Sequence, residues 1–279
     1  MLNVKNILVT GGSGFLGTHL VTALSSLGLN VIQYCYDIRD PIELDQDIDV
    51  VFHLAAVTSN RVFQEKPHYG YSVNVLSTLN ILEFCKKKNA LLVFTSTCGV
   101  YSSCCSGPIK EDFPIQSRDP YSHSKYLAEQ ICSYYSNNLS VRCVVLRLFN
   151  VFGHGQPDYF LISYLINRAK SGEEILLKSP HSVRDFIYVS DVVQALINAA
   201  CYKDGEFNIF NIGSGAGIKV IDILKCIEQI SKKKVKYKTD SKYNDSFPVP
   251  IADISNSKEE LGWKPEITLL EGLRKTLFS

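Results

Sequence analysis

Tyr121 and Lys125 are the residues whose types and spacing best suit proton-transfer chemistry. They lie four positions apart, and in a helix that spacing places both side chains on one face. The pKa of a tyrosine is ordinarily about 10, and a nearby ammonium group lowers it by favouring the phenolate. The same lysine is also able to donate hydrogen bonds to ribose hydroxyls. Because this spacing also occurs on ordinary helix faces, the neighbouring elements must decide its meaning.

A glycine-rich stretch near the start of the chain indicates a binding site for a diphosphate. The short apolar run Ile7 to Val9 is typical of a buried strand. Four glycines follow this run: Gly11, Gly12, Gly14 and Gly17. An amphipathic helix then begins, and its free N–H groups and dipole attract phosphate if no side chain blocks the approach. The alternative is a glycine turn that serves only close packing.

The segment after the next apolar run bears on which dinucleotide is bound. Asn30 to Tyr34 predicts a second strand and completes a strand–helix–strand unit. Asp37 lies about twenty positions beyond the glycines, where an acidic residue commonly holds the adenine ribose hydroxyls. Alternatively, Asp37 and Ile38 lie beside the adenine ring, which leaves Cys35 at the strand end. Arg39 could meet a ribose phosphate, which is a feature of NADP sites. We expect NAD, without excluding NADP.

Two further strands are expected to bring small and hydroxyl side chains to the same edge of a sheet. Asp49 to Ala56 predicts a strand that ends in small residues, as a chain must beneath a cofactor, and its His53 is interpreted as a core residue. A helix is expected from Asn74 through Phe84. The next strand, Ala90 to Ser96, leads to Thr97. Ligands of open parallel sheets bind outside the carboxyl ends of the strands, so these hydroxyls are expected to face the chemistry.

The helix that carries Tyr121 is expected to follow a polar loop. Residues 102 to 119 are rich in Ser, Pro and Gly and predict a surface loop or lid. Asp119 suits the N-cap position and Pro120 the first helical position, so the helix is expected to begin there. Near the carboxyl end, Asn256 and Thr268 are expected to cap two short helices. Trp263, between them, is interpreted as a core residue.

Composition limits the class of protein. A chain of 279 residues is long enough for one large α/β domain or for a main domain with a smaller companion. With 29 Lys plus Arg against 28 Asp plus Glu, it has no overall charge that would attract nucleic acid or an anionic membrane. Nine cysteines without a C-x-x-C pair predict neither a disulfide framework nor a metal site. No apolar run is as long as a membrane span and no signal peptide is expected, which favours the cytoplasm.

Motifs along nearly the whole chain resemble the extended short-chain dehydrogenase/reductase family, in its branch of NAD(P)-dependent nucleotide-sugar epimerases, dehydratases and reductases. They are Thr10 to Gly17, His53 to Ala56, Asn74-Val75, Thr95 to Thr97, Val100-Tyr101, Pro120-Tyr121, Ser124-Lys125, Leu146 to Gly153, Arg184 to Asp191, Asn211 to Gly215 and Leu261 to Pro265. The resemblance implies a Rossmann-type, doubly wound parallel sheet over residues 1–152 and 183–212. It implies a smaller substrate-binding domain over 153–182 and 213–279, and a homodimer.

The resemblance also implies roles for individual residues. Tyr121 would be the acid/base, Lys125 its tuner and a ligand of the nicotinamide ribose, and Thr97 the hydroxyl that orients the reacting sugar oxygen. Asn150 and Arg184 would hold the diphosphate of a nucleotide sugar, since a guanidinium binds phosphate oxygens in pairs. The alternative for Arg184 is a salt bridge with Asp185 or Asp191. The implied cofactor ligands are Gly11, Gly14, Phe15, Leu16, Gly17, Asp37, Ile38, Leu54, Ala55, Ala56, Asn74, Tyr121, Lys125 and Phe149.

The departures from the family pattern favour some reactions over others. The 4,6-dehydratases carry an Asp-Glu pair just after the active-site threonine, whereas this chain has Cys98-Gly99, which disfavours dehydration. Cys98 stands three positions before Tyr101, not two as in GDP-fucose synthase, and is interpreted as a small semi-buried side chain. We expect a C4 epimerase; the alternative is a reductase of a 4-keto-6-deoxy nucleotide sugar. A non-catalytic NAD(P)-binding regulator is a third interpretation, and the presence of Thr97, Tyr121 and Lys125 argues against it.

Overall fold

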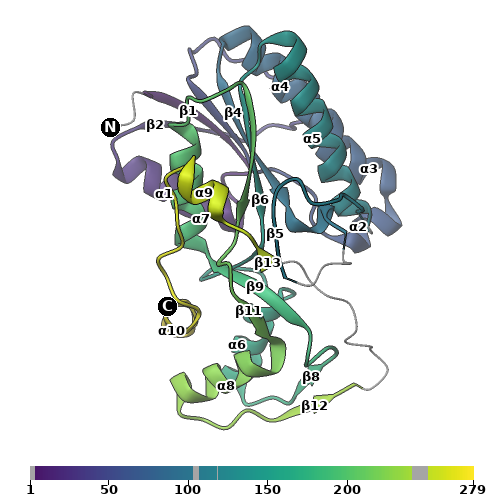
Figure 1. Ribbon diagram of the computed structural model, residues 1–279, viewed down its shortest axis with the longest axis vertical. Coiled ribbons are helices and arrows are strands. Elements are labelled where there is room, and N and C mark those ends of the chain that lie inside the picture. The colour runs from purple at the N-terminus through teal and green to yellow at the C-terminus, as the bar shows by residue number, and fades with distance from the viewer. Residues whose placement is uncertain (1–3, 103–106, 118, 241–250) are drawn as a thin grey trace.

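A six-stranded parallel sheet forms the centre of the computed structural model, which describes residues 4–102, 107–117, 119–240 and 251–279 (Figure 1). The strands are β1 (Asn6–Thr10), β2 (Asn30–Tyr34), β3 (Val50–His53), β4 (Leu91–Thr97), β6 (Cys143–Leu148) and β10 (Phe207–Ile212). Their order is β10-β6-β4-β3-β1-β2, and every neighbouring pair is parallel. The direction of winding changes between β1 and β3, where open sheets of this kind bind ligands. The predicted doubly wound sheet is therefore confirmed.

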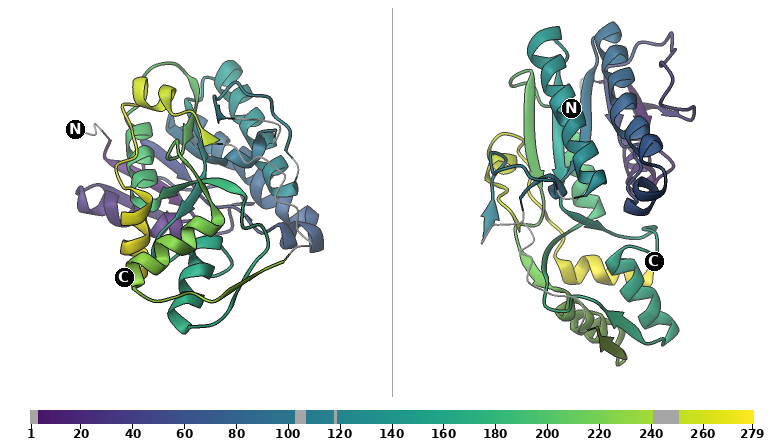
Figure 2. Two further views of the ribbon diagram at one scale, coloured as in Figure 1. Left: turned by 60° about the horizontal axis from the view of Figure 1, so that its bottom comes forward. Right: turned by 90° about the vertical axis from the view of Figure 1, so that its right-hand side faces the viewer.

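Helices cover both faces of the sheet. Helices α1 (Phe15–Ser26) and α7 (Val189–Ala200) pack together on one face, and α4 (Ser77–Lys88) and α5 (Pro120–Leu139) pack together on the other. Figure 2 shows the sheet between these two layers. Successive strand residues alternate between two buried clusters, which explains why the inner strands are apolar along their whole length.

A second group of elements lies below the carboxyl ends of the large sheet (Figure 1). It comprises α6 (Leu161–Ser171), β8 (Ile175–Leu177), α8 (Val220–Ser231) and α10 (Leu269–Phe278), which share a separate apolar core, and the exposed strand β12 (Tyr237–Thr239), which pairs with β8. The strands β7 (Asn150–Phe152), β9 (Val183–Tyr188) and β11 (Gly217–Lys219) form a three-stranded sheet. Because β9 leads straight into α7, this sheet connects the second core to the first.

The remaining elements are short. They are α2 (Asn60–Glu65), α3 (Pro67–Tyr71), a π-helix (Ser72–Leu76), a 3₁₀ turn (Cys98–Val100), paired strands β5 (Pro108–Ile109) and β13 (Ile251–Ala252), and α9 (Ser255–Glu259). The π-helix and α4 replace the single helix predicted from Asn74. The strand predicted from Asp49 to Ala56 is present but ends at His53, where the chain turns away from the sheet.

Several local predictions can be compared directly with the structure. The Asp119 carboxylate accepts a hydrogen bond from the Ser122 amide (3.0 Å), which confirms the N-cap of α5. Thr268 caps α10 in the same way. The cap predicted at Asn256 is wrong, because Ile254 precedes α9 and the Asn256 amide donates to the Ile209 carbonyl. Trp263 is buried and donates to the Asp191 carbonyl (2.9 Å), as expected for a core residue.

The described residues also bear on the cysteines and on membrane spans. All seven cysteines within them are free, whereas Cys104 and Cys105 lie outside the described residues together with part of the predicted loop at 102 to 119. Within the same ranges, no helix has the length and apolarity needed to cross a membrane.

A buried ion pair ties α5 to the sheet. Arg147 on β6 and Glu129 on α5 are 3% and 1% exposed, and Arg147 Nη2 lies 2.7 Å from Glu129 Oε2. Arg147 Nη1 also donates to the Tyr101 hydroxyl (2.9 Å), which in turn donates to Asn211 Oδ1 (2.6 Å). The guanidinium therefore connects α5, β6, β10 and the turn that follows Thr97. Removing either charge would leave the other buried without its partner.

We expect Glu129→Ala to lower the free energy of unfolding by about 3–5 kcal/mol, because it strands the Arg147 charge in the interior. Glu65→Ala is the matched control, since the Glu65 pair with Arg61 is mostly exposed and such pairs contribute less than about 1 kcal/mol. Urea unfolding of both variants checks the difference. Equal losses would show that the buried pair has no special place in the fold.

Candidate active site

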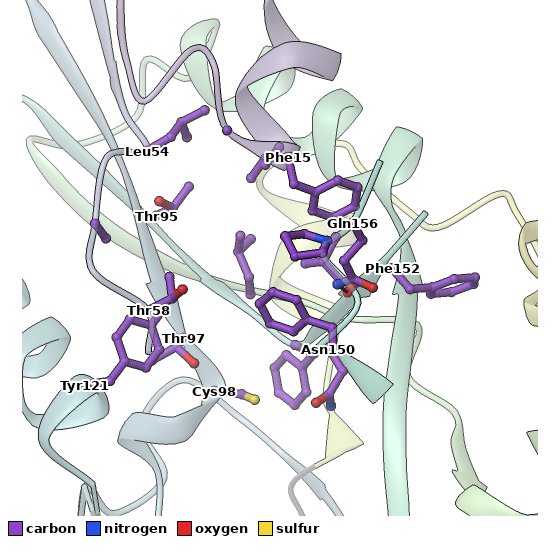
Figure 3. Close-up of a pocket in the computed structure, with 18 of the residues that line it drawn as sticks. Phe15, Leu54, Thr58, Thr95, Thr97, Cys98, Tyr121, Asn150, Phe152 and Gln156 are labelled. Atoms are coloured by element: carbon purple, nitrogen blue, oxygen red, sulfur yellow. Dashed lines mark hydrogen bonds between the residues drawn. The ribbon is translucent and has the colours of Figure 1, made fainter. Parts of the chain in front are cut away.

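One cavity of about 510 Å³ lies at the carboxyl ends of the sheet strands. Its walls come from the glycine turn after β1, the end of β4, the first turns of α5, the strands β7 and β9, and the start of α6. The cavity therefore lies between the large sheet and the second group of elements. Figure 3 shows its side chains converging from both.

The glycine turn leaves room for a diphosphate. Gly11 has a φ of +72°, and a β-carbon there would lie 2.6 Å from the Ala55 backbone nitrogen. A β-carbon at Gly17 would overlap the Gly11 carbonyl oxygen. Helix α1 begins at Phe15 with no acidic residue in its first turn, and Phe15 and Leu16 line the cavity. Free N–H groups at a helix start that no side chain covers suit an anionic group.

Tyr121, Thr97 and Lys125 line the same end of the cavity. Figure 3 shows the Tyr121 ring beside Thr97, with Thr58 next to it. Thr97 Oγ1 accepts a hydrogen bond from the Gly99 amide (3.1 Å), so its hydroxyl proton is left to be donated. Lys125 Nζ donates to the Thr95 carbonyl (2.8 Å). The structure thus brings together the three residues predicted to be catalytic.

The pKa values of Tyr121 and Lys125 differ from the expectation that the nearby ammonium lowers the pKa of the tyrosine. Burial raises the pKa of Tyr121 above its usual range, and the neighbouring Cys98 and Asp119 add to this effect. Burial also lowers the pKa of Lys125 to about 8. The lowering of the Tyr121 pKa that the spacing predicts is absent, because the ammonium is directed to the Thr95 carbonyl and desolvation dominates.

The cavity wall also presents a guanidinium. Arg184 lines the cavity, makes a long hydrogen bond to Ser182 Oγ (3.4 Å), and has no ion pair with any carboxylate of the described residues. Burial lowers its pKa. Asp185 instead accepts from the Ser214 amide (2.7 Å), and Asp191 accepts from the Ile267 amide (3.0 Å). The alternative of a salt bridge to either carboxylate is therefore not what the structure contains.

A family model described as the NAD dependent epimerase/dehydratase family matches residues 7–213. The chain belongs to this family. A relative from Methanocaldococcus jannaschii, a putative UDP-glucose 4-epimerase, is 33% identical over 304 aligned positions that cover 97% of each chain. Other relatives, from Arabidopsis thaliana, are named UDP-glucuronic acid decarboxylases.

Solved structures of the epimerase/dehydratase family match the whole fold. UDP-glucose 4-epimerase from Thermotoga maritima, with UDP-glucose, has a TM-score of 0.88 and 29% identity, covering 98% of this chain and 97% of that one. MoeE5 in complex with UDP-glucuronic acid and NAD has a TM-score of 0.89 and 27% identity, covering 98% of both. Further similar structures hold NAD or NADPH. The family therefore binds NAD(P), and the glycine turn of this chain fits such a dinucleotide.

The other predicted ligands divide into two groups. Leu54, Ala56, Phe149 and Asn150 line the cavity together with the glycines. Four others, Asp37, Ile38, Ala55 and Asn74, are not among its lining residues. The Ala55 amide donates to Thr10 Oγ1 (3.3 Å), and the Ile38 carbonyl accepts from the Asn80 amide group (3.3 Å). The Asn74 side chain is hydrogen-bonded to Val57 and to Ser124.

Asp37 and Arg39 are engaged with each other. Arg39 Nε lies 2.9 Å from Asp37 Oδ1, and this hydrogen bond lowers the pKa of Asp37 to about 2. The Arg39 guanidinium also lies over the Tyr69 ring, 5.3 Å from its centre. Neither residue lines the cavity, and the preference for NAD over NADP stays a prediction.

Several lining residues were not identified from the sequence. Thr58, Gln156 and Phe160 come from loops, where no periodic pattern marks a residue that faces a cavity. Ser96, by contrast, lines the cavity as its place at the strand end predicted, and its Oγ is buried without a hydrogen-bond partner among the described residues. Cys98 is half-buried there, as interpreted, and burial raises its pKa to about 12, so it is a neutral thiol. The position of Cys98 directly after Thr97 was the one sequence signal that it lines the cavity.

The lowered pKa of Lys125 predicts how the free energy of unfolding changes with pH. Between about pH 8 and 10.5 the unfolded chain binds the proton that native Lys125 has lost, so the free energy of unfolding rises with pH. Relative to Lys125→Met, we expect the wild type to gain about 2 kcal/mol between pH 7 and about pH 9.5 in urea unfolding. The exposed Lys87→Met should show no such gain. A pH-independent difference between wild type and Lys125→Met would contradict this.

Proposed function

We propose that this chain is an NAD(P)-dependent nucleotide-sugar epimerase that acts by transient hydride transfer at C4 of the sugar. The observation that carries the proposal is that the glycine turn, Thr97, Tyr121 with Lys125, and Arg184 all line one cavity. This combination provides a place for a dinucleotide, an acid/base pair and a group for a diphosphate. The names of the Methanocaldococcus jannaschii relative and the Thermotoga maritima structure support it.

In the proposed reaction, the chain's own side chains move a proton at the sugar C4 oxygen. Tyr121 acts as the phenolate and removes the proton from the hydroxyl as the carbon loses hydride. Burial alone disfavours this form, so the positive charges of Lys125 and of the oxidised nicotinamide, when bound, would stabilise it. Thr97 orients the same oxygen by donating a hydrogen bond. The nicotinamide, when bound, supplies the chemistry of accepting and returning hydride. After the 4-keto sugar turns over, Tyr121 returns the proton as hydride reaches the other face. Lys125 provides positive charge near the phenolate and a donor for the ribose.

Other residues of the cavity wall would hold the diphosphate and limit access of water. Arg184 supplies a guanidinium with no competing carboxylate among the described residues, which suits paired phosphate oxygens. Asn150, whose side-chain amide donates to the Asp185 carbonyl (2.8 Å), stands beside it in the cavity wall. Phe152, Phe160 and Phe186 add an apolar surface that excludes water from the sugar.

A second candidate is a reductase of a 4-keto-6-deoxy nucleotide sugar. It would use the same Tyr121 and Thr97. Hydride would pass once from NAD(P)H to the C4 ketone, Tyr121 would supply the proton, and the alcohol would leave as the product. The compact chain and the short segment after β2 favour this candidate. A purely regulatory role is disfavoured because Thr97, Tyr121 and Lys125 share one cavity with the glycine turn.

Incubation of the purified protein with UDP-galactose and no added cofactor separates these candidates. An epimerase that retains its cofactor should form UDP-glucose, whereas turnover only with a 4-keto sugar and NAD(P)H would support the reductase. We expect Tyr121→Phe to lower kcat by about 10²–10⁴ because it removes the acid/base. Tyr126→Phe, on the same helix and outside the cavity, is the matched control. Full activity in Tyr121→Phe would contradict the proposal.

A further inference from the structure

Asn74 lies in the π-helix between α3 and α4 and is 1% exposed. The resemblance assigns it to the cofactor, and its side chain is hydrogen-bonded to Val57 and to Ser124. A π turn is rare and is frequently found at functional sites. Here it sets a polar side chain between the loop after β3 and helix α5.

The Asn74 amide joins the loop to the Tyr121 helix. Its Oδ1 accepts from the Val57 amide (2.8 Å), and its Nδ2 donates to the Val57 carbonyl (2.9 Å). Nδ2 also donates to Ser124 Oγ (2.9 Å), and that hydroxyl donates to the Tyr121 carbonyl (2.7 Å). A continuous chain of hydrogen bonds thus runs from Val57, next to the cavity residues Ala56 and Thr58, to the backbone of Tyr121.

A second arm runs from Asn74 to the end of β1. Thr78 Oγ1 donates to the Asn74 carbonyl (2.9 Å) and therefore accepts from His53 Nε2 (3.3 Å). His53 Nδ1 then accepts from Thr10 Oγ1 (2.8 Å), whose remaining lone pairs accept from the Ala55 amide (3.3 Å). Burial lowers the pKa of His53 to about 3, so the ring is neutral and matches this assignment of one donor and one acceptor.

We propose that Asn74, acting through Ser124, is a positioning residue that fixes Tyr121 relative to the loop after β3, whose residues Ala56 and Thr58 line the cavity. This inference rests on the proposed role of Tyr121 as the acid/base. Only an amide side chain is able to accept from one backbone N–H while donating to both a carbonyl and a hydroxyl. An ångström of misplacement at a reacting group costs up to about a hundredfold in rate, so the hydrogen bonds matter beyond stability.

Two variants test the proposal with UDP-galactose as substrate. Ser124→Ala removes the hydroxyl between Asn74 and the Tyr121 carbonyl, and Asn74→Asp keeps the size but loses both side-chain donor bonds. We expect Ser124→Ala to lower kcat about tenfold and Asn74→Asp more, with the Kd for NAD within about twofold of wild type. Ser133→Ala, on the same helix with only an exposed contact to Asn137, is the control and should keep the wild-type kcat.

The outcomes separate this inference from the proposed function. If Tyr121→Phe is inactive but Ser124→Ala keeps the wild-type kcat, the positioning role is wrong and the proposed function stands. If Tyr121→Phe is fully active, the acid/base assignment itself fails. A loss of NAD affinity in Ser124→Ala as large as the loss of kcat would also overturn the inference, because it would point to general damage. Ser124→Ala removes only a hydroxyl group, so it tests the positioning role even if Asn74→Asp does not fold.

Discussion

The requirement that buried polar groups be hydrogen-bonded governs how helix α5 sits on the sheet. Among the buried polar residues of this helix are Ser124, Lys125 and Glu129, and each of these three has its partner on a different element. Ser124 meets Asn74, Lys125 meets the Thr95 carbonyl, and Glu129 meets Arg147. An apolar helix face could slide or rotate at little cost. These partners allow one placement only, and Tyr121 is held at the cavity as a result.

The same burial explains the electrostatic state of the site. Desolvation disfavours charge on both members of the Tyr121–Lys125 pair, so the pKa of the phenol rises and that of the amine falls to about 8. A spacing of four residues places the two side chains on one face but does not determine where the ammonium points. In this structure it points to the Thr95 carbonyl, and Lys125 Nζ also lies over the Phe94 ring, 4.5 Å from its centre. A ligand that offers hydroxyls at this place would give the ammonium a second acceptor.

Local patterns were sufficient for much of the fold and for the core of the site. Continuous apolar runs gave the inner strands, Asp119 with Pro120 gave the start of α5, and the glycines gave the turn beneath α1. Each of these features depends on residues a few positions apart. The family resemblance, not the spacing, assigned the sugar-facing Asn150 and Arg184, and both line the cavity.

What escaped sequence reasoning depends on residues far apart in the chain. The hydrogen-bond partners of Asn74, Val57 and Ser124, lie 17 and 50 positions away from it. Its π turn has no sequence signature comparable to a cap or a glycine. Thr58 reaches the cavity because the loop after β3 is held by Asn74. In each case a tertiary contact overrides the local pattern.

The most direct test of the central claim, that Tyr121, Thr97 and the nicotinamide meet at one sugar carbon, is a crystal structure with NAD and a nucleotide sugar. We expect the Tyr121 hydroxyl and Thr97 Oγ1 each to lie about 2.6–3.2 Å from the same sugar oxygen, with the diphosphate at Arg184. A sugar bound away from Tyr121, or a nicotinamide facing a different wall of the cavity, would contradict the claim.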